Sequence, residues 1–314
     1  MPSSIAPAAD QPRNDMTTKH QLVPKVSVCM IAYNHGPYIR QAIESILAQD
    51  VIFPIELVIG DDCSQDNTAA ICEEFAARDP RVRLLGRERN LGVMPNFSRT
   101  LQACRGEYIA VCEGDDYWTN PMKLQRQIGF LEEHADYAGA THQAQVIIDN
   151  LPVRPFRAHV PAMLTTNDLI GGRQFHMASV TFRKSVIPLF CNAPLVLGCD
   201  RLLNFCISFA GKIHYTEESM CVYRLHGGGM SSNATVEQMK LELNSIPYLQ
   251  KLQPKFPGYR YLSYVYAAIG LSRSARLDQK LRFLMLSFIF SFSYFPNNLM
   301  VIGSRLFRLG ARRS

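Results

Sequence analysis

The sequence predicts an α/β fold, in which a doubly wound and mostly parallel sheet is followed by a helical C-terminal extension. Short apolar segments alternate with amphipathic ones from residue 26 to residue 112, an order typical of a sheet with helices on both faces. Of the 314 residues, 47% are hydrophobic, which is enough to bury a large core. Ordinary glycine and proline contents and the lack of an internal repeat exclude collagen-like, solenoid and propeller folds.

The first strand and helix are the clearest elements of this pattern. Residues 26–32 (VSVCMIA) are apolar without alternation, as expected of a strand that is covered on both faces. After an Asn-His-Gly-Pro turn, the apolar residues are spaced by three and four, which predicts an amphipathic helix. These residues are Ile39, Ala42, Ile43, Ile46 and Leu47.

The same alternation continues along the first half of the chain. Strands are predicted at 55–59, 82–85 and 108–112, and helices at 68–77, 96–104 and 121–134. Ligands of doubly wound sheets bind beyond the carboxyl ends of the strands. The loops after the strands at 26–32, 55–59 and 108–112 are therefore expected to carry the chemistry.

The second half of the chain has a different pattern. Apolar runs at 145–148, 178–182 and 212–225 predict further strands with long connections, a usual place for an acceptor site. From about Thr235 the sequence becomes helical and rich in aromatic residues. We expect a disordered leader at 1–21, an α/β domain at 22–234 and a helical, basic region at 235–314.

The positive charge of the chain is confined to its C-terminal end. The formal net charge is +6, and residues 276–314 hold seven basic residues against Asp278 as the only acidic one. The rest of the chain is neutral, so the composition argues against nucleic acid as a partner. The apolar run at 283–295 is shorter than the roughly twenty residues that span a bilayer. With its flanking arginines it predicts a helix in the interface of an anionic membrane, although a core or dimer helix fits the same pattern.

The cysteines and the N-terminus predict the cellular compartment. The nine cysteines are scattered and never spaced as Cys-x-x-Cys, which argues against a disulfide framework or a zinc site. Residues 1–21 lack the apolar segment of a signal peptide. Both observations favour a cytoplasmic protein.

Two acidic clusters follow predicted strands. Asp61 and Asp62 follow the strand at 55–59. Neighbouring carboxylates repel each other unless hydrogen-bond donors or a cation lie beside them. A nucleoside has such donors. Glu113, Asp115 and Asp116 follow the strand at 108–112, and this density of carboxylates suits a hard divalent cation such as Mg²⁺ or Mn²⁺ that also binds diphosphate oxygens.

Taken together, these motifs resemble the family 2 glycosyltransferases, which have the GT-A fold, a Rossmann-like doubly wound sheet. The resemblance extends over residues 24–232 in the order of the family. Its motifs are VSVCMIAYN (26–34), IGDDCSQDNT (59–68), RNLG (89–92), GEYIAVCEGDDYW (106–118), SVTFRKS (179–185) and CVYRLHGG (221–228).

The resemblance implies roles for the residues that match its motifs. It implies that Tyr33 lies against the nucleobase and that Asp62, with Asp61 beside it, accepts from the base or the ribose. Arg89 belongs to the same donor site. Asp115 and Asp116 match the metal-binding motif that holds the nucleotide diphosphate, with Glu113 at a position where the family often has Asp.

Further downstream the resemblance implies a catalytic base and contacts to the acceptor. Asp200 is the only carboxylate between Asp168 and Glu217 and is expected to be the base, although it fits a helix N-cap as well. His226 precedes three glycines and is expected at the diphosphate. His176 and Trp118 are expected at the acceptor site, where the Trp118 ring could stack on a sugar.

The resemblance therefore implies an inverting, metal-dependent enzyme of bacterial cell-surface polysaccharide synthesis, such as lipopolysaccharide synthesis. The donor would be a nucleotide sugar, with a UDP-sugar favoured, and the acceptor a glycan or a lipid-linked glycan. The enzyme would lie on the cytoplasmic face of the inner membrane. Two alternatives remain open, a catalytically inactive relative that binds sugar nucleotides and a sugar nucleotidyltransferase. The second usually has a glycine-rich phosphate loop after its first strand, which Ala32 to Gly36 does not resemble.

Overall fold

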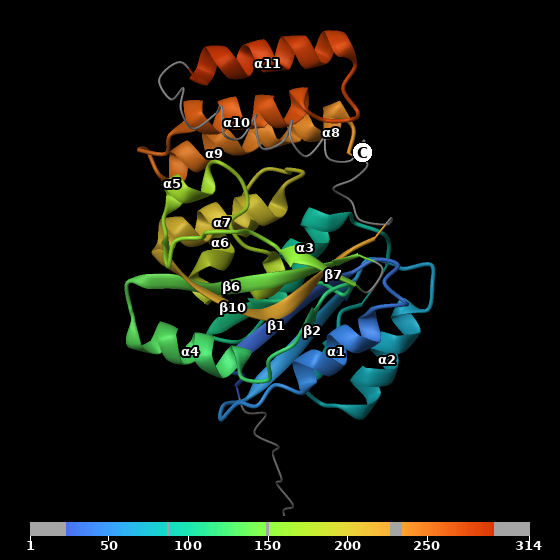
Figure 1. Ribbon diagram of the computed structural model, residues 1–314. Helices are drawn as coiled ribbons and strands as arrows, with labels where there is room; N and C mark the ends of the chain where they lie inside the picture. Colours follow the sequence, from blue (N-terminus) through green and yellow to red (C-terminus); the bar gives the residue numbers. More distant parts are fainter. Residues whose placement is uncertain (1–22, 87, 149–150, 227–233, 292–314) are drawn as a thin grey trace, which may run out of the picture.

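The structure is a computed structural model, and it describes residues 23–86, 88–148, 151–226 and 234–291 (Figure 1). The predicted leader at 1–21 lies outside the described residues, as do residues 292–295 of the apolar run. A single mixed sheet of ten strands runs through the lower part of the molecule, and a layer of helices covers it at the C-terminal end (Figure 1). The α/β prediction with a helical C-terminal extension is therefore confirmed.

The parallel half of the sheet has the strand order β3-β2-β1-β4. These strands are β1 (Val26–Ala32), β2 (Ile55–Asp61), β3 (Val82–Leu84) and β4 (Tyr108–Val111). Because β1 pairs in parallel with both β2 and β4, the strand order reverses beside it. Ligand sites lie at such reversals in open α/β sheets.

Strand β1 is buried along its whole length, which explains why its sequence does not alternate. Val28 and Met30 point into a core formed with α1 (Ile39–Leu47), α2 (Thr68–Arg78) and α4 (Lys123–Glu133). Cys29 and Ile31 point into a second core on the opposite face, which α3 (Val93–Ala103) covers. Each face of the strand thus has its own layer of helices.

The second half of the sheet is mixed, as the long connections predict. Strand β9 (Thr181–Arg183) joins it antiparallel to β4, and β6 (Tyr137–Ile148) and β10 (Lys212–Leu225) pair in parallel beyond it. Three short strands complete the sheet, namely β5 (Tyr117–Trp118), β7 (Leu151–Pro155) and β8 (Met163–Leu164). Two of the predicted strand boundaries are wrong. The run at 145–148 is only the end of β6, and the run at 178–182 is a 3-10 turn (Met177–Ser179) followed by β9.

The remaining helices pack over one face of the sheet and continue into the C-terminal region. They are α5 (Thr166–Leu169), α6 (Ile187–Cys191), α7 (Cys199–Ala210), α8 (Val236–Lys240), α9 (Ser245–Leu252), α10 (Gly258–Gly270) and α11 (Leu277–Ser291). Phe205 of α7 lies in one continuous core with Tyr261 of α10 and Phe283 of α11. No helix in the described part of the chain is long and apolar enough to cross a membrane.

A buried glutamate links the C-terminal helices α8 to α11 to the loop before α7. Glu242 accepts a hydrogen bond from the Gly198 backbone N–H at 2.9 Å and another from the Tyr261 hydroxyl. Its carboxylate also lies 3.5 Å from the Arg201 guanidinium, which covers the Tyr264 ring. A Cβ at position 198 would approach the Glu242 carboxylate to 2.7 Å, so the glycine permits this close contact. The start of α7, which carries Asp200, is therefore held from the C-terminal layer.

Candidate active site

The loops that follow β1 and β2 are tied together by hydrogen bonds. The Asn34 backbone N–H donates to the Ser64 hydroxyl at 2.9 Å, and the Gln65 N–H donates to the Asn34 amide oxygen at 2.8 Å. Asn34 has a φ of 56°, a left-handed conformation that asparagine adopts more readily than most residues. The two loops thus form one rigid rim at the carboxyl ends of the strands.

Asp61 and Asp62 are buried beneath this rim and accept hydrogen bonds from nearby loops. The two Asp62 carboxylate oxygens accept from the backbone N–H groups of Leu91 and Gly92, at 2.7 and 2.8 Å. Asp61 accepts from the Ser64 backbone N–H and from its hydroxyl. Both carboxylates are therefore engaged by donors of the chain itself, and the contact of Asp62 with a base or ribose stays a prediction. The N–H donors that satisfy Asp62 belong to the RNLG motif, which it positions.

Tyr33 and Arg89 are the exposed residues of the predicted donor site. Tyr33 lies directly after β1 and is 45% exposed, so its ring is open to a nucleobase. Arg89 is exposed in the loop that Asp62 holds through Leu91 and Gly92. These two side chains are accessible to a ligand, and their contacts with the donor stay predictions.

The acidic loop, residues 113–116, packs tightly against the loop after β1. The Gly114 N–H donates to the Ile31 carbonyl at 3.0 Å. A Cβ at Gly114 would lie 2.5 Å from Ile39 Cδ1 and 2.9 Å from His35 Nδ1, so any larger residue would displace these side chains. This close approach places the Glu113 and Asp115 carboxylates at the carboxyl end of β4, beside His35.

Asp115 is paired with two histidines. His226 Nε2 lies 3.0 Å from Asp115 Oδ2, and His35 Nε2 lies 3.7 Å from the same oxygen. Burial opposes ionisation of Asp115, but the hydrogen bond with His226 and the charge of His35 outweigh it and lower the pKa of Asp115. The same hydrogen bond raises the pKa of His226. His226 is therefore held at the acidic loop, and its predicted contact with the diphosphate stays a prediction.

Asp116 is 1% exposed, and only one of its two carboxylate oxygens has a hydrogen-bond partner in the protein. Its Oδ1 accepts from the Arg224 backbone N–H at 3.0 Å. Its Oδ2 has no hydrogen-bond partner and lies 3.3 Å from His176 Nδ1, a nitrogen that itself accepts from the Ala178 N–H. Two acceptor atoms thus face each other in the protein interior, which is costly unless a cation or a proton lies between them.

Glu113 completes a group of three residues that could ligate a metal. Ligand atoms of Glu113, Asp116 and His176 all lie within 4.8 Å of one another, the one such group among the described residues. Burial and the neighbouring Asp115 and Asp200 carboxylates raise the pKa of Glu113 to about 8. Burial, reinforced by Asp115 and Glu113, raises the pKa of Asp116 too. A divalent cation would relieve this repulsion. The two carboxylates suit Mg²⁺ or Mn²⁺, and the imidazole is a further nitrogen ligand for a divalent transition metal. The donor set therefore fits a cation.

Asp200 lies close to this group but is held by an arginine. Its Oδ2 is 3.1 Å from Arg173 Nη1, and its Oδ1 accepts from the Arg201 backbone N–H at 2.8 Å. Burial opposes ionisation, but Arg173 and then Arg201 lower the pKa of Asp200, so its carboxylate is ionised at neutral pH. The ion-pair partner is thus Arg173 rather than its neighbour Arg201, whose guanidinium lies by Glu242.

The two predicted acceptor residues are both buried. Trp118 is 4% exposed, its indole N–H donates to the Ala178 carbonyl at 2.7 Å, and Lys123 Nζ lies 4.2 Å above its ring. The ring is packed in the core here, and the stacking of a sugar on Trp118 stays a prediction. His176 is stacked on Tyr223 with ring centroids 4.0 Å apart and faces Asp116 rather than an open surface.

Three site residues were missed by the sequence analysis. His35, Arg173 and Arg224 each contact a predicted residue, and Arg224 Nη1 also donates to the Asp115 carbonyl at 2.6 Å. Arg224 lies inside a recognised motif, His35 directly follows another, and Arg173 lies in none. Their contacts depend on loops distant in sequence, so no local pattern identifies all three.

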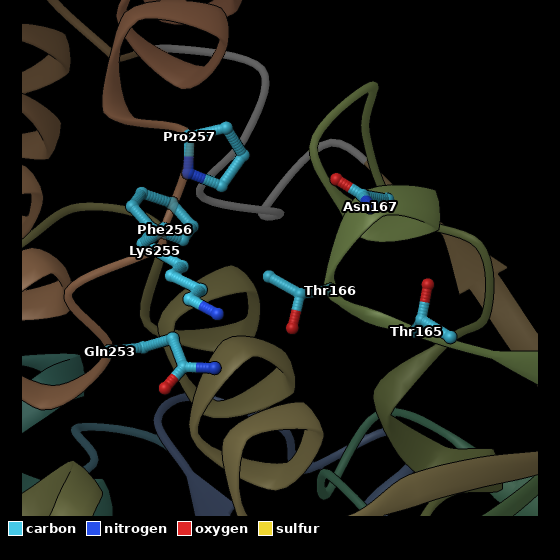
Figure 2. A pocket seen from close by; sticks show the side chains of 7 residues that line it. All are labelled: Thr165, Thr166, Asn167, Gln253, Lys255, Phe256 and Pro257. Atoms are coloured by element: carbon cyan, nitrogen blue, oxygen red, sulfur yellow. The ribbon is translucent and has the colours of Figure 1, made fainter.

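A separate pocket of about 240 Å³ lies at the base of the C-terminal helical layer. Figure 2 shows its lining, in which the Lys255 side chain points across the opening towards Thr166. None of the predicted site residues lines this pocket. It therefore takes no part in the site around the acidic loop.

The family profile described as "Glycosyl transferase family 2" matches residues 27–184. An uncharacterised protein of Mycobacterium tuberculosis is 35% identical over 223 residues, which is 68% of this chain and 63% of that protein. The succinoglycan biosynthesis protein ExoO of Rhizobium meliloti is 43% identical over 131 residues, which is 42% of this chain and 34% of ExoO. The chain thus spans less than two thirds of the length of these relatives.

Two solved structures share the fold at low sequence identity. TarS of S. aureus, in complex with UDP-GlcNAc, has a TM-score of 0.59 at 19% identity and covers 91% of this chain and 92% of its own. The mannosyltransferase PcManGT of Pyrobaculum calidifontis, in complex with GDP-Man and Mn²⁺, has a TM-score of 0.53 at 15% identity, covering 93% of this chain and 87% of its own. The profile match covers half of the chain and includes β1 and the acidic loop. On this match, the chain belongs to glycosyltransferase family 2.

Proposed function

We propose that the chain is an inverting, metal-dependent glycosyltransferase that transfers a sugar from a nucleotide-diphosphate donor to a hydroxyl group of a glycan or lipid-linked acceptor. The observation that carries the proposal is the unpartnered Asp116 oxygen, which faces His176 and Glu113 near the ionised Asp200. This arrangement combines a place for a cation with a carboxylate that can accept a proton. It argues against a catalytically inactive relative, and family membership argues against a nucleotidyltransferase.

Glu113, Asp116 and His176 would hold the divalent cation, Mg²⁺ or Mn²⁺, with Asp115 as a further ligand next to Asp116 in the chain. When bound, the cation would neutralise the charge on the departing nucleoside diphosphate. PcManGT, which shares the fold, is described in complex with Mn²⁺. The proposed metal set thus differs from the sequence prediction by including His176.

The donor would lie along the rim that the loops after β1 and β2 form. The exposed Tyr33 ring would stack on the nucleobase, and Arg89 would pair with the donor from the loop that Asp62 holds. His226, whose pKa is raised by its hydrogen bond with Asp115, would donate a hydrogen bond to a phosphate oxygen. UDP is the favoured nucleotide, since TarS binds UDP-GlcNAc, with GDP as the alternative that PcManGT suggests.

Asp200 would act as the general base of the transfer. It takes the proton of the acceptor hydroxyl while the oxygen attacks the anomeric carbon and the bond from that carbon to the diphosphate oxygen breaks. A single base opposite the leaving group gives direct displacement, and the anomeric configuration inverts. Arg173 keeps Asp200 ionised before the proton arrives.

The biological setting of this reaction is proposed from the relatives. ExoO is described as a succinoglycan biosynthesis protein, which supports a role in bacterial cell-surface polysaccharide synthesis, with lipopolysaccharide as one case. We place the enzyme in the cytoplasm, where nucleotide sugars are made, at the cytoplasmic face of the inner membrane. The acceptor would be a growing glycan or a lipid-linked precursor at that face.

A nucleotide panel tests the proposed donor site. We expect one of UDP, GDP, CDP and dTDP to raise the unfolding midpoint only when Mn²⁺ is present. At a ligand concentration about 100 times Kd the shift is expected to be about 5 °C, because ligand binding stabilises only the folded state. Each nucleotide with EDTA is the control. If none of the four nucleotides shifts the midpoint with Mn²⁺ or Mg²⁺, the donor site is wrongly assigned.

A further inference from the structure

The outermost helix of the molecule, α11, has an apolar face that the described residues leave open. Figure 1 shows α11 on the outer side of α10, at the far end of the molecule from the parallel strands. Four large apolar side chains on its outer face are between 55% and 73% exposed. They are Leu277, Leu281, Met285 and Ile289.

The opposite face of α11 packs and hydrogen-bonds against α10, and this contact sets which side chains of α11 are exposed. The Ser263 hydroxyl of α10 donates to the Ser287 carbonyl, and the Ser287 hydroxyl donates to the Ser263 carbonyl, each at 2.9 Å. Phe283 and Ser291 are buried on the same side. Phe283, the first residue of the apolar run for which both a membrane and a core position were open, thus belongs to the protein core. A rotation of α11 that buried Leu281 would break both serine hydrogen bonds.

The charges around this face are almost all positive. Arg282 is exposed next to it in the helix, and Arg273 and Arg276 precede the helix. Asp278, the one acidic residue of the helix, lies 3.2 Å from the Arg276 guanidinium. Arginine and lysine beside an exposed apolar helix face are typical of helices that lie in the interface of an anionic membrane.

The same charges argue against a second copy of the chain as the cover of this face, because it would bring the same basic residues against themselves. A surface that carries negative charge and accepts apolar side chains matches both the basic residues and the apolar face of α11.

We propose that the outer face of α11 docks onto an anionic lipid surface, inserting Leu277, Leu281, Met285 and Ile289 among the lipids while the flanking arginines contact the headgroups. The inference goes beyond the proposed catalysis and does not depend on it. Docking would hold the enzyme at the surface where lipid-linked acceptors lie.

Sedimentation of the full chain with lipid vesicles tests the docking face. We expect binding to vesicles of phosphatidylcholine mixed with phosphatidylglycerol and little binding to phosphatidylcholine alone. The double variant Leu281→Glu/Met285→Glu should bind the anionic vesicles at least about tenfold more weakly, because it places two charges in the inserted face. The milder Leu281→Gln/Met285→Gln variant should be weakened in the same direction.

The control is the double variant Ile52→Glu/Leu151→Glu, which adds the same charge at exposed apolar positions outside the C-terminal layer. It should bind as the unmodified chain does. Equal binding of the unmodified chain and the Leu281→Glu/Met285→Glu variant would overturn the proposal. So would a dimer of the unmodified chain that the variant abolishes, since a second copy would then cover the face. Nucleotide binding does not depend on membrane docking. Failure of vesicle binding would therefore leave the proposed glycosyltransferase activity untouched.

Discussion

Replacement of Asp200 by asparagine is expected to lower kcat by about 10³-fold, within the range of 10² to 10⁴ that a general base contributes. The amide has the same shape, and its oxygen can still accept from the Arg201 backbone N–H, but its NH2 group then faces Arg173 in place of Oδ2. This donor-to-donor contact should cost about 1–3 kcal/mol of stability, so an unfolding curve of the variant accompanies the rate measurement. Initial rates of nucleoside diphosphate release, with donor and acceptor saturating, measure the effect.

The matched control for this variant is Asp136→Asn. Asp136 is an exposed carboxylate directly before β6 that pairs with Lys212 at 2.8 Å, and it belongs to no part of the proposed site. Its removal should leave kcat unchanged. If Asp200→Asn turns over within about twofold of the unmodified enzyme, Asp200 is not the base and its place at the start of α7 is structural.

Replacement of Asp116 by asparagine is expected to abolish metal-dependent nucleotide binding without destabilising the metal-free protein. The new amide group would donate to His176 Nδ1, 3.3 Å from the present oxygen, and its oxygen would still accept from the Arg224 N–H. Loss of a direct ligand should weaken Mn²⁺ binding by at least about 100-fold, the upper end of the effect of losing a ligand's supporting partner. Calorimetric titration with Mn²⁺ and an unfolding curve in EDTA measure the two halves of this prediction.

A second variant, Asp62→Asn, tests whether the loss of metal binding is specific to a proposed ligand or follows from removal of any carboxylate in the site. Asp62→Asn would place an amide N–H against the N–H of Leu91 or Gly92, which should cost about 1–3 kcal/mol of stability. Mn²⁺ binding should persist in it, since Asp62 lies outside the proposed metal group. If Asp116→Asn binds Mn²⁺ as tightly as the unmodified protein, the metal is not held by Asp116.

Local patterns in the sequence predicted the parallel half of the fold well. The continuous apolar run of β1 and the helical spacing of α1 are properties of neighbouring residues, and both elements have the predicted positions. Strand β6 was mostly missed because its first residues, YAGATHQA, are small or polar and carry no apolar period. They are buried because β6 lies inside the sheet between β9 and β10 and its two faces pack against α7 and α4, which no local pattern predicts.

The candidate site was predictable only where its chemistry lies within one loop. Three carboxylates within four residues make Glu113, Asp115 and Asp116 recognisable in the sequence. The contact of His176 with Asp116 is not recognisable there, because it depends on the turn before β9 lying at the end of β4. The donors that satisfy Asp62 are backbone N–H groups, which every residue except proline has, so no side-chain pattern reveals them. Arg173 pairs with Asp200 across 27 positions of chain, a contact that depends on where α7 begins.

The stereochemistry of donor cleavage tests the central claim most directly. In the absence of acceptor, an α-linked nucleotide sugar bound by this enzyme should slowly transfer its sugar to water, and proton NMR distinguishes the anomers before they equilibrate. We predict that the β-anomer appears first, that EDTA stops its release, and that Asp200→Asn releases little of it. Release of the α-anomer first, or release at the same rate in EDTA, would contradict an inverting, metal-dependent transfer at this site.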